Sequence, residues 1–276
     1  MKYEFTGETK IFFGIELKRI RATAAIEKYN VAVGDLGGWI EDEKNLDQYG
    51  GAWVSGDAQV CGDAKVYGNA RVSGGAWVSG DAKVYGNARV SGNAQVCGDA
   101  KVCGDAKVYG DAKVYGDAWV SGGAWVSGDA QVCGDAKVYG NAWVSGGAWV
   151  SGDARVCGDA KVYGDAKVYG DARVYGNARV SGGAWEKSPL YIQGAKYPFY
   201  MAAANKVGCG CQVFTFAGWH KFWRKIAAKF DMTEAEQTEY VSYFNLACER
   251  YGKLEFKIDL TDGSGNDEPE SETDDG

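Results

Sequence analysis

Gly51-Ala52-Trp53-Val54-Ser55-Gly56, followed directly by Asp57-Ala58-Gln59-Val60-Cys61-Gly62, opens the stretch of sequence that decides the fold. From residue 51 to residue 182 the chain consists of 22 consecutive hexads without insertion, each with alanine second, valine fourth and glycine sixth. Alanine and valine share one face of a strand because they are two residues apart, and the third and fifth residues share the other face. Glycine and the Asp, Asn or Gly after it supply a turn. Each hexad is therefore predicted to be a short strand plus a corner.

Three hexads would close a triangular coil with valine and alanine inside, and residues three hexads apart would then stack in columns. One corner column is aspartate at every level: Asp63, Asp81, Asp99, Asp117, Asp135, Asp153 and Asp171. Only 13 of the 22 corners are aspartate, so this unbroken column favours three hexads per coil. The predicted fold class is mostly β, a triangular parallel β-helix over residues 35–185 with its regular hexads at 51–182.

Both ends of such a stack need caps, because they expose sheet edges and the apolar interior. Residues 1–34 alternate as in a β-hairpin and are predicted to form the N-terminal cap. Residues 35–50 are interpreted as a degenerate first coil, with Ile40 and Leu46 at six-residue spacing.

The composition changes after Trp185, and residues 186–260 are predicted to form a small α+β cap. We expect a strand over 207–216 and then two amphipathic helices. The first carries its apolar face on Trp219, Phe222, Trp223, Ile226 and Phe230, and the second carries it on Tyr240, Tyr243, Phe244, Ala247, Cys248 and Tyr251. Thr233 and Glu236 are spaced as a capping box for the second helix. Residues 261–276 contain seven acidic side chains and no basic one, and are predicted to be a disordered acidic tail.

The hexads resemble those of the hexapeptide-repeat, left-handed β-helix superfamily, which is trimeric and LpxA-like. The segments 18–22, 34–40 and 45–46 resemble the start of bacterial YdcK-like β-helix proteins and of phage and prophage proteins with the same layout. Gly208-Cys209-Gly210-Cys211 and the helices after it resemble the phage members. The resemblance implies a left-handed helix, permits a homotrimer, and points to a bacterial host cell.

Charge and targeting signals narrow the functional classes. Residues 51–182 contain 13 Lys plus Arg and 13 Asp, and the whole chain carries −7, so we expect no nucleic-acid partner. No run of apolar residues approaches a membrane span, and the first residues lack a signal-peptide layout. Cys61, Cys97, Cys103, Cys133 and Cys157 all occupy the fifth hexad position and are interpreted as surface residues of a cytoplasmic protein.

Enzymes of the superfamily that the hexads resemble use histidine, either as an acyltransferase base or as three zinc ligands of a carbonic anhydrase. This chain has one histidine, His220, outside the solenoid. We therefore predict no catalytic, cofactor or metal site. A zinc site of Cys209, Cys211, Cys248 and His220 is a weaker alternative. The aspartate column could bind cations, but Lys, Arg or Trp follows each aspartate by two residues, which favours internal charge compensation.

The third-position tryptophans are the predicted interaction residues: Trp53, Trp77, Trp119, Trp125, Trp143 and Trp149. Such aromatic residues either stiffen the outer surface of the sheet or present a flat face to a protein or glycan partner. The function predicted from the sequence is a non-enzymatic scaffold that presents its caps or an aromatic face to a partner. The alternative is an acyltransferase-like enzyme with a non-standard active site.

Overall fold

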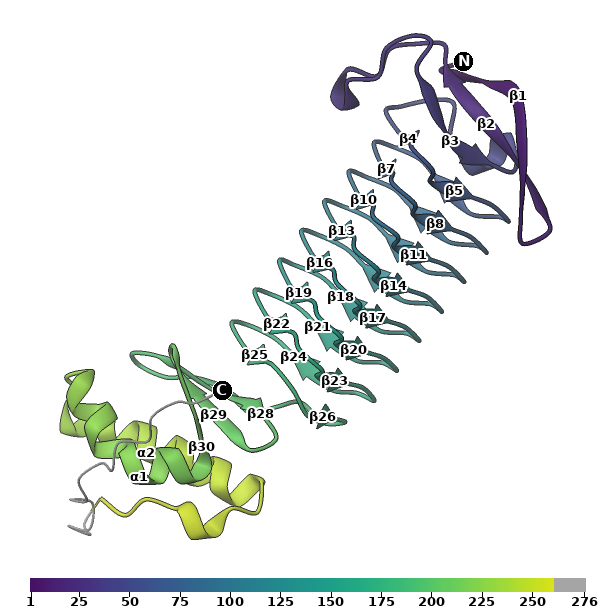
Figure 1. Cartoon of the computed structure of the whole chain (residues 1–276). Helices are drawn as coiled ribbons and strands as arrows, with labels where there is room; N and C mark the ends of the chain where they lie inside the picture. The colour runs from purple at the N-terminus through teal and green to yellow at the C-terminus, as the bar shows by residue number, and fades with distance from the viewer. Residues whose placement is uncertain (261–276) are drawn as a thin grey trace, which may run out of the picture. The chain divides into compact units, whose positions relative to one another are not determined.

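The computed structural model describes residues 1–260, which belong to two compact units (Figure 1). The first unit runs from Met1 to Pro189 and the second begins at Leu190. The predicted acidic tail, residues 261–276, lies outside the described residues. None of the helices in the described part is long and apolar enough to span a bilayer.

Each hexad of the first unit forms a two-residue strand at its third and fourth positions, followed by a corner. Each strand pairs in parallel with the strand one coil later, as Lys83 pairs with Lys101 and Val84 with Val102. Partners in the regular region are therefore three hexads apart, which confirms the predicted parallel β-solenoid with three strands per coil.

The strands form three sheets, one for each side of the coil. The tryptophan face consists of β4 (Trp53–Val54), β7 (Arg71–Val72), β10 (Arg89–Val90), β13 (Lys107–Val108), β16 (Trp125–Val126), β19 (Trp143–Val144), β22 (Lys161–Val162) and β25 (Arg179–Val180). The hairpin face contains β5 (Gln59–Val60), β8 (Trp77–Val78), β11 (Gln95–Val96), β14 (Lys113–Val114), β17 (Gln131–Val132), β20 (Trp149–Val150), β23 (Lys167–Val168) and β26 (Ala184–Trp185).

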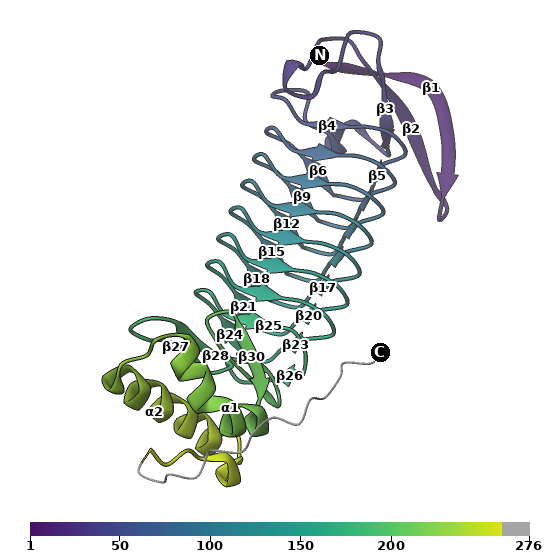
Figure 2. The same ribbon diagram turned by 60° about the vertical axis from the view of Figure 1, so that its left-hand side comes forward.

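The aspartate face, named for the corner column that precedes it, is turned towards the viewer in Figure 2. It consists of β6 (Lys65–Val66), β9 (Lys83–Val84), β12 (Lys101–Val102), β15 (Trp119–Val120), β18 (Lys137–Val138), β21 (Arg155–Val156) and β24 (Arg173–Val174).

The interior of the solenoid is built from the alanine and valine of each hexad, which are at most 1% exposed. The corners depend on glycine for two reasons, as Gly104 illustrates. Its φ of 67° lies in the left-handed region, and a Cβ on it would lie 2.9 Å from the backbone nitrogen of Gly122. Only glycine satisfies both requirements where one coil stacks on the next.

The first coil is less regular than the others. Ile40 in β3 (Leu36–Ile40) pairs with Val60, and Leu46 forms a bridge to Val66, both at a spacing slightly wider than three hexads. Both side chains are fully buried, so residues 35–50 do form a first coil. The short helix η2 (Glu43–Asn45) helps to close it, because the Asn45 amide donates to the carbonyls of Gly62 and Ala64 at 2.9 Å.

A hairpin of β1 (Tyr3–Phe12) and β2 (Ile15–Ala22) extends the hairpin face, since β2 pairs with β3. The resulting order begins β1-β2-β3-β5 in an eleven-stranded sheet. The outer strand β1 is interrupted by a register shift between Phe5 and Thr9, where Gly7 has a φ of 89°. Such a bulge disfavours further pairing at an exposed sheet edge.

The last coil is slightly shorter than the regular coils. Trp185 in β26 pairs with Val168, one position short of three full hexads, and takes the inward position that valine holds elsewhere. Its side chain is buried, so a large aromatic residue fills the end of the solenoid interior.

The second unit contains an antiparallel sheet followed by two helices. The sheet runs in the order β27 (Tyr191–Gln193), β28 (Pro198–Ala203), β29 (Lys206–Cys209) and β30 (Gln212–Thr215). The helices are α1 (Phe216–Lys229), α2 (Glu234–Arg250) and the short η3 (Leu254–Phe256). The Thr233–Glu236 capping box is confirmed, and Trp219, Trp223, Ile226, Tyr240 and Phe244 are buried as expected.

The prediction of one strand over 207–216 is wrong. A turn at Gly210, with a φ of 58°, separates β29 from β30, and the two strands pair with each other. The glycine between Cys209 and Cys211 was a sign of this turn, because it adopts a left-handed conformation that few other residues tolerate.

Candidate functional site on the outer faces of the solenoid

The structure distributes the six predicted interaction tryptophans over three faces. Trp53, Trp125 and Trp143 lie on the tryptophan face, Trp77 and Trp149 on the hairpin face, and Trp119 on the aspartate face. Only Trp125 and Trp143 are neighbours, with ring centroids 5.3 Å apart. The six residues therefore do not form one aromatic face.

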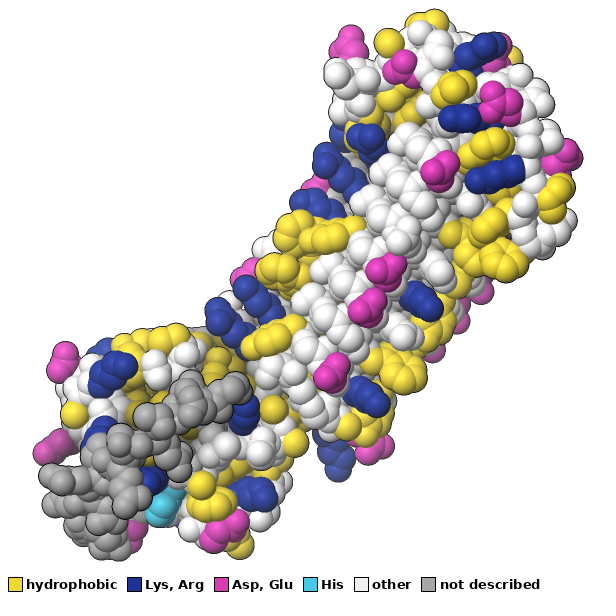
Figure 3. Space-filling view, in the orientation of Figure 1, with side chains coloured by type: hydrophobic (Ala, Val, Ile, Leu, Met, Phe, Trp, Pro, Cys, Tyr) yellow, Lys and Arg dark blue, Asp and Glu magenta, His cyan; other side chains and the backbone are white. Residues whose placement is uncertain are grey.

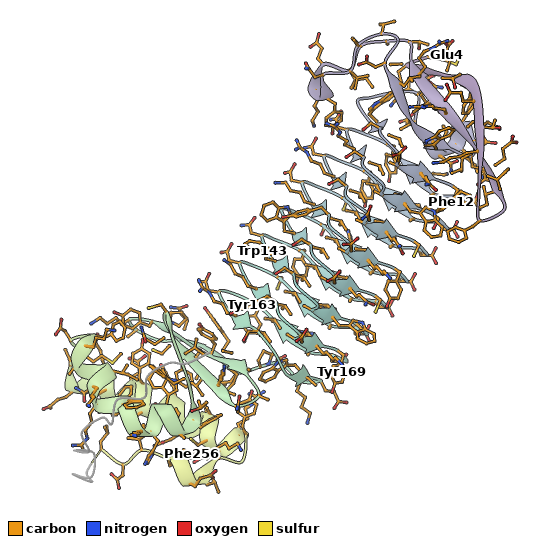
Figure 4. The ribbon with its side chains drawn as sticks, in the orientation of Figure 1. Glu4, Phe12, Trp143, Tyr163, Tyr169 and Phe256 are labelled. Atoms are coloured by element: carbon orange, nitrogen blue, oxygen red, sulfur yellow. The ribbon has the colours of Figure 1, made fainter. Side chains whose placement is uncertain are left out.

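Trp53 and Trp77 lie in the solenoid strands β4 and β8 and pack against residues N-terminal to the hexads. Trp53 is 1% exposed and packs so closely against Gly37 that a Cβ there would lie 2.9 Å from the indole ring. Trp77 receives the tip of the β1–β2 hairpin, which bends back over the hairpin face (Figures 1 and 4). The ring of Phe13 stacks on Trp77 at 5.5 Å, and Phe12 meets it edge-on at 5.3 Å. Trp77 therefore anchors the cap, whereas Trp53 packs against the first coil.

Three of the other tryptophans lean back along the solenoid onto the preceding coil. The indole Nε1 of Trp119 donates to Cys103 Sγ at 3.1 Å, and that of Trp149 donates to Cys133 Sγ at 3.1 Å. Trp143 makes the equivalent contact with Ser127 Oγ at 3.4 Å. Each partner lies 16 residues earlier at the fifth hexad position. These contacts support the interpretation that tryptophans stiffen the outer surface.

The aromatic strip, which we define as Tyr109, Trp125, Trp143, Lys107 and Lys161, crosses the middle of the tryptophan face. Tyr109 meets Trp125 edge-on at 5.4 Å. The ammonium group of Lys107 lies 4.7 Å from the Trp125 ring centre, and that of Lys161 lies 5.3 Å from Trp143. Trp143 is 36% exposed and projects from the tryptophan face in Figure 4. Figure 3, in the same orientation, shows hydrophobic and basic side chains together on this side of the solenoid.

The hexads are neutral overall, but the three faces of the solenoid differ in net charge. The tryptophan face carries five basic side chains at its third positions and only two aspartates at its corners, namely Arg71, Arg89, Lys107, Lys161, Arg179, Asp105 and Asp159. The hairpin face has two bases and four aspartates, namely Lys113, Lys167, Asp57, Asp111, Asp129 and Asp165. The aspartate face has six bases and seven aspartates at these positions, so the aromatic strip lies on the face whose hexads carry a net positive charge.

The prediction that the fifth-position cysteines are surface residues is wrong for three of them. Cys61, Cys103 and Cys133 are buried because the indole of Trp77, Trp119 or Trp149 covers each one from the next coil. Cys97 and Cys157, which have no such tryptophan, are half-buried. The missed signal was the fixed spacing, just under three hexads, between a tryptophan and a small fifth-position residue.

Tyrosine and cysteine also meet between coils. A hydrogen bond to Cys103, together with burial, raises the pKa of Tyr85 to about 12. The same arrangement with Cys133 raises the pKa of Tyr115 to about 12. These hydroxyl groups stay protonated near neutral pH, so they are not poised to act as bases there.

Beside the aspartate column runs a basic column, formed two residues further on by Lys65, Lys83, Lys101, Lys137, Arg155 and Arg173. The two columns line a groove that includes Asp81, Lys83, Asp99 and Lys101. All seven aspartates are exposed. Lys44 pairs with Asp63 at 2.7 Å, and this is the only ion pair that either column makes with the described residues. The two columns offset each other's charge by proximity and not through close ion pairs.

The hypothetical zinc ligands of the second unit are not brought together. Among residues 1–260, no three His, Cys, Asp or Glu side chains are placed to hold a metal ion. Burial raises the pKa of Cys209 to about 12 and that of Cys248 to about 11. The His220 Nδ1 atom instead lies 3.0 Å from the carbonyl oxygen of Phe256.

Comparison with known families finds the YdcK beta solenoid repeat within the hexad region. The repeat model matches residues 64–80, 82–98, 130–146, 136–152 and 172–187. A comparison with curated proteins gives no match. The matches support a YdcK-like β-solenoid, in agreement with the paired strands described above.

Proposed function

We propose that the protein is a non-enzymatic scaffold whose solenoid presents the aromatic strip to an acidic protein surface. One observation carries this proposal. Trp125 and Trp143 lie 5.3 Å apart on a regular sheet face, with the ammonium groups of Lys107 and Lys161 held against their rings.

The chemistry of the strip suits a protein interface. Tryptophan and tyrosine near the centre of a contact supply much of the binding energy in protein complexes. Lys107 and Lys161 keep ammonium protons available for carboxylates of a partner while their charge rests against an aromatic ring. Complementary charge of this kind speeds and orients association.

The basic excess of the tryptophan face suits an acidic protein, and the charge of the rest of the chain disfavours a nucleic acid. A nucleic-acid site needs basic groups that follow a long phosphate path, whereas here the aspartate column lies on the same rod and the chain carries −7 overall. The strip also lies within a sheet, where the strands are already paired on both sides. The partner is therefore contacted by side chains, as between two folded proteins.

Glutamine substitutions test the proposal without disturbing the repeat, because Gln59, Gln95 and Gln131 occupy the same hexad position. The wild-type chain, Trp125→Gln/Trp143→Gln and the control Trp119→Gln/Trp149→Gln serve as baits in affinity purification from bacterial lysate. We expect an acidic protein that is retained by the wild type and the control, lost by the Trp125/Trp143 variant, and released by salt.

Capture that all baits share equally would contradict this function. Loss of binding to a glycan array by the Trp125/Trp143 variant, with no protein captured, would assign the strip to a carbohydrate instead. An acyl transfer from an acyl-CoA donor catalysed by the purified chain would contradict the non-enzymatic role.

We further propose that the protein acts in the cytoplasm of a bacterial host. The resemblance to phage and prophage proteins supports this setting, as do the eight free thiols of the described residues. Fractionation of cells that produce the full chain should place it with cytoplasmic markers, and recovery from the periplasm would contradict the proposal.

A further inference from the structure

We propose that two copies of this chain associate in parallel through their aspartate faces. The aspartate column comprises Asp63, Asp81, Asp99, Asp117, Asp135, Asp153 and Asp171. The basic column, two residues further on at each level, comprises Lys65, Lys83, Lys101, Lys137, Arg155 and Arg173, with Trp119 in its middle. This surface is independent of the aromatic strip.

Among residues 1–260, the two columns have one close ion-pair partner, Lys44. Apart from Lys44–Asp63, no described residue forms an ion pair with either column. Successive side chains of one column are a single coil apart, or about 4.8 Å, so like charges face each other at each step. A second surface that brings the opposite sign to each level would relieve this repulsion.

The order of the columns selects the symmetry of the pair. In a face-to-face contact, a two-fold axis parallel to the columns exchanges left and right and keeps each level. Asp81 of one copy then faces Lys83 of the other, and Asp99 faces Lys101. A two-fold axis across the columns would instead place aspartate on aspartate. Charge complementarity therefore requires parallel rods in register.

The aspartate face is also the one that the N-terminal cap leaves open. The β1–β2 hairpin lies over the hairpin face, away from the aspartate face in Figure 2. The loop with η1 (Glu27–Tyr29) contacts Asn69, Arg71 and Asn87 at the edge of the tryptophan face. The central levels offer a hollow beside Trp119, which is 40% exposed, lined also by Ser121 and Tyr139.

The pattern fits a second copy better than an unrelated partner. A purely acidic surface would meet the aspartate column, and a purely basic one would meet the basic column. An occupant needs both signs in adjacent columns that repeat at the spacing of one coil. The chain itself supplies such a surface.

Charge reversal tests the pairing level by level. Lys83→Glu/Lys101→Glu places acids opposite Asp81 and Asp99 of the second copy, and Asp81→Lys/Asp99→Lys places bases opposite Lys83 and Lys101. Sedimentation velocity at low salt should show the wild type at twice the chain mass of 29.6 kDa. For each variant alone, the dissociation constant of the dimer should rise about 100-fold or more. An equimolar mixture of the two variants should recover the dimer, because each reversed residue then meets its complement.

Lys113→Glu/Lys167→Glu on the hairpin face is the control for Lys83→Glu/Lys101→Glu, because it changes the net charge by the same amount. It should dimerise like the wild type. High salt should dissociate the wild-type dimer. A wild type that stays monomeric at low salt and high concentration overturns the proposal. The proposal is also overturned if Lys83→Glu/Lys101→Glu dimerises as the wild type does, if the mixture of the two variants forms no dimer, or if the wild type forms a particle of three chains.

Discussion

The ring of Phe13 lies stacked on the indole of Trp77, with 5.5 Å between the ring centroids and 19° between their planes. This contact joins the tip of the N-terminal hairpin to β8, two strands along the hairpin face from β3. The cap is therefore held by its sheet pairing at one end and by an aromatic clasp at the other. Trp77, which the repeat pattern presents as an outward residue, is part of that clasp.

Trp77→Gln should release the hairpin tip while leaving the solenoid folded. The variant loses both ring contacts and the indole hydrogen bond to Cys61, which we expect to lower local stability by about 1–3 kcal/mol. Hydrogen exchange should become faster in residues 10–16. Trp149 lies on the same face but does not contact the hairpin tip, so Trp149→Gln should leave the exchange of residues 10–16 unchanged. Equal exchange of these residues in the two variants would contradict the role of Trp77 in holding the hairpin.

Gly104→Ala should destabilise the solenoid by about 2–4 kcal/mol. Alanine is strained at a φ of 67°, and its Cβ would lie 2.9 Å from the backbone nitrogen of Gly122, so two coils must separate. Gly182→Ala is the control, because a Cβ there meets nothing within 4 Å and no left-handed φ is required. Urea unfolding should show the control within about 0.5 kcal/mol of the wild type.

The second unit should lose stability in alkaline solution. Burial raises the pKa of Cys209 to about 12 and of Cys248 to about 11, from an ordinary value of 9.0. The unfolded chain therefore releases these protons first as the pH rises. The stability they contribute is complete below pH 9 and is lost towards pH 11–12, by at most about 1.4 kcal/mol per pH unit for each thiol.

Urea unfolding followed by circular dichroism at ~222 nm reports this loss, because α1 and α2 are the two long helices of the described residues. Cys209→Ala/Cys248→Ala should be less stable at neutral pH but should show a shallower decline between pH 9 and 11. If the free energy of unfolding fell equally with pH in the wild type and the double variant, the two thiols would not be the cause of the decline.

The repeat predicted the solenoid because its determinants are local and periodic. Val84 and Val102 stack because every hexad buries its alanine and valine, and Gly104 marks a corner through its own conformation. Ile40 and Leu46 could be placed in a first coil by the same spacing. These inferences need only the six-residue pattern and the size of the interior.

Contacts between coils and caps could not be predicted in the same way. Whether Trp77 is covered depends on where the hairpin lies, which a pattern within the hexads does not encode. The burial of Cys103 depends on the direction in which the Trp119 indole leans. The aromatic strip required the actual contacts of Trp125 and Trp143 with the lysines above and below them.

The central claim is that coils of three hexads stack the outer side chains into columns, since both proposed surfaces depend on those columns. Spin labels at Gln59 and Lys167, in a variant whose native cysteines are replaced by serine or alanine, test it by electron–electron double resonance. Both positions lie on the hairpin face, six coils apart, so their backbones should be separated by about 29 Å at ~4.8 Å per coil. A distance near ~29 Å, allowing for the label arms, is the predicted result, whereas a distance near ~43 Å, as two hexads per coil would give on the same face, would contradict the account.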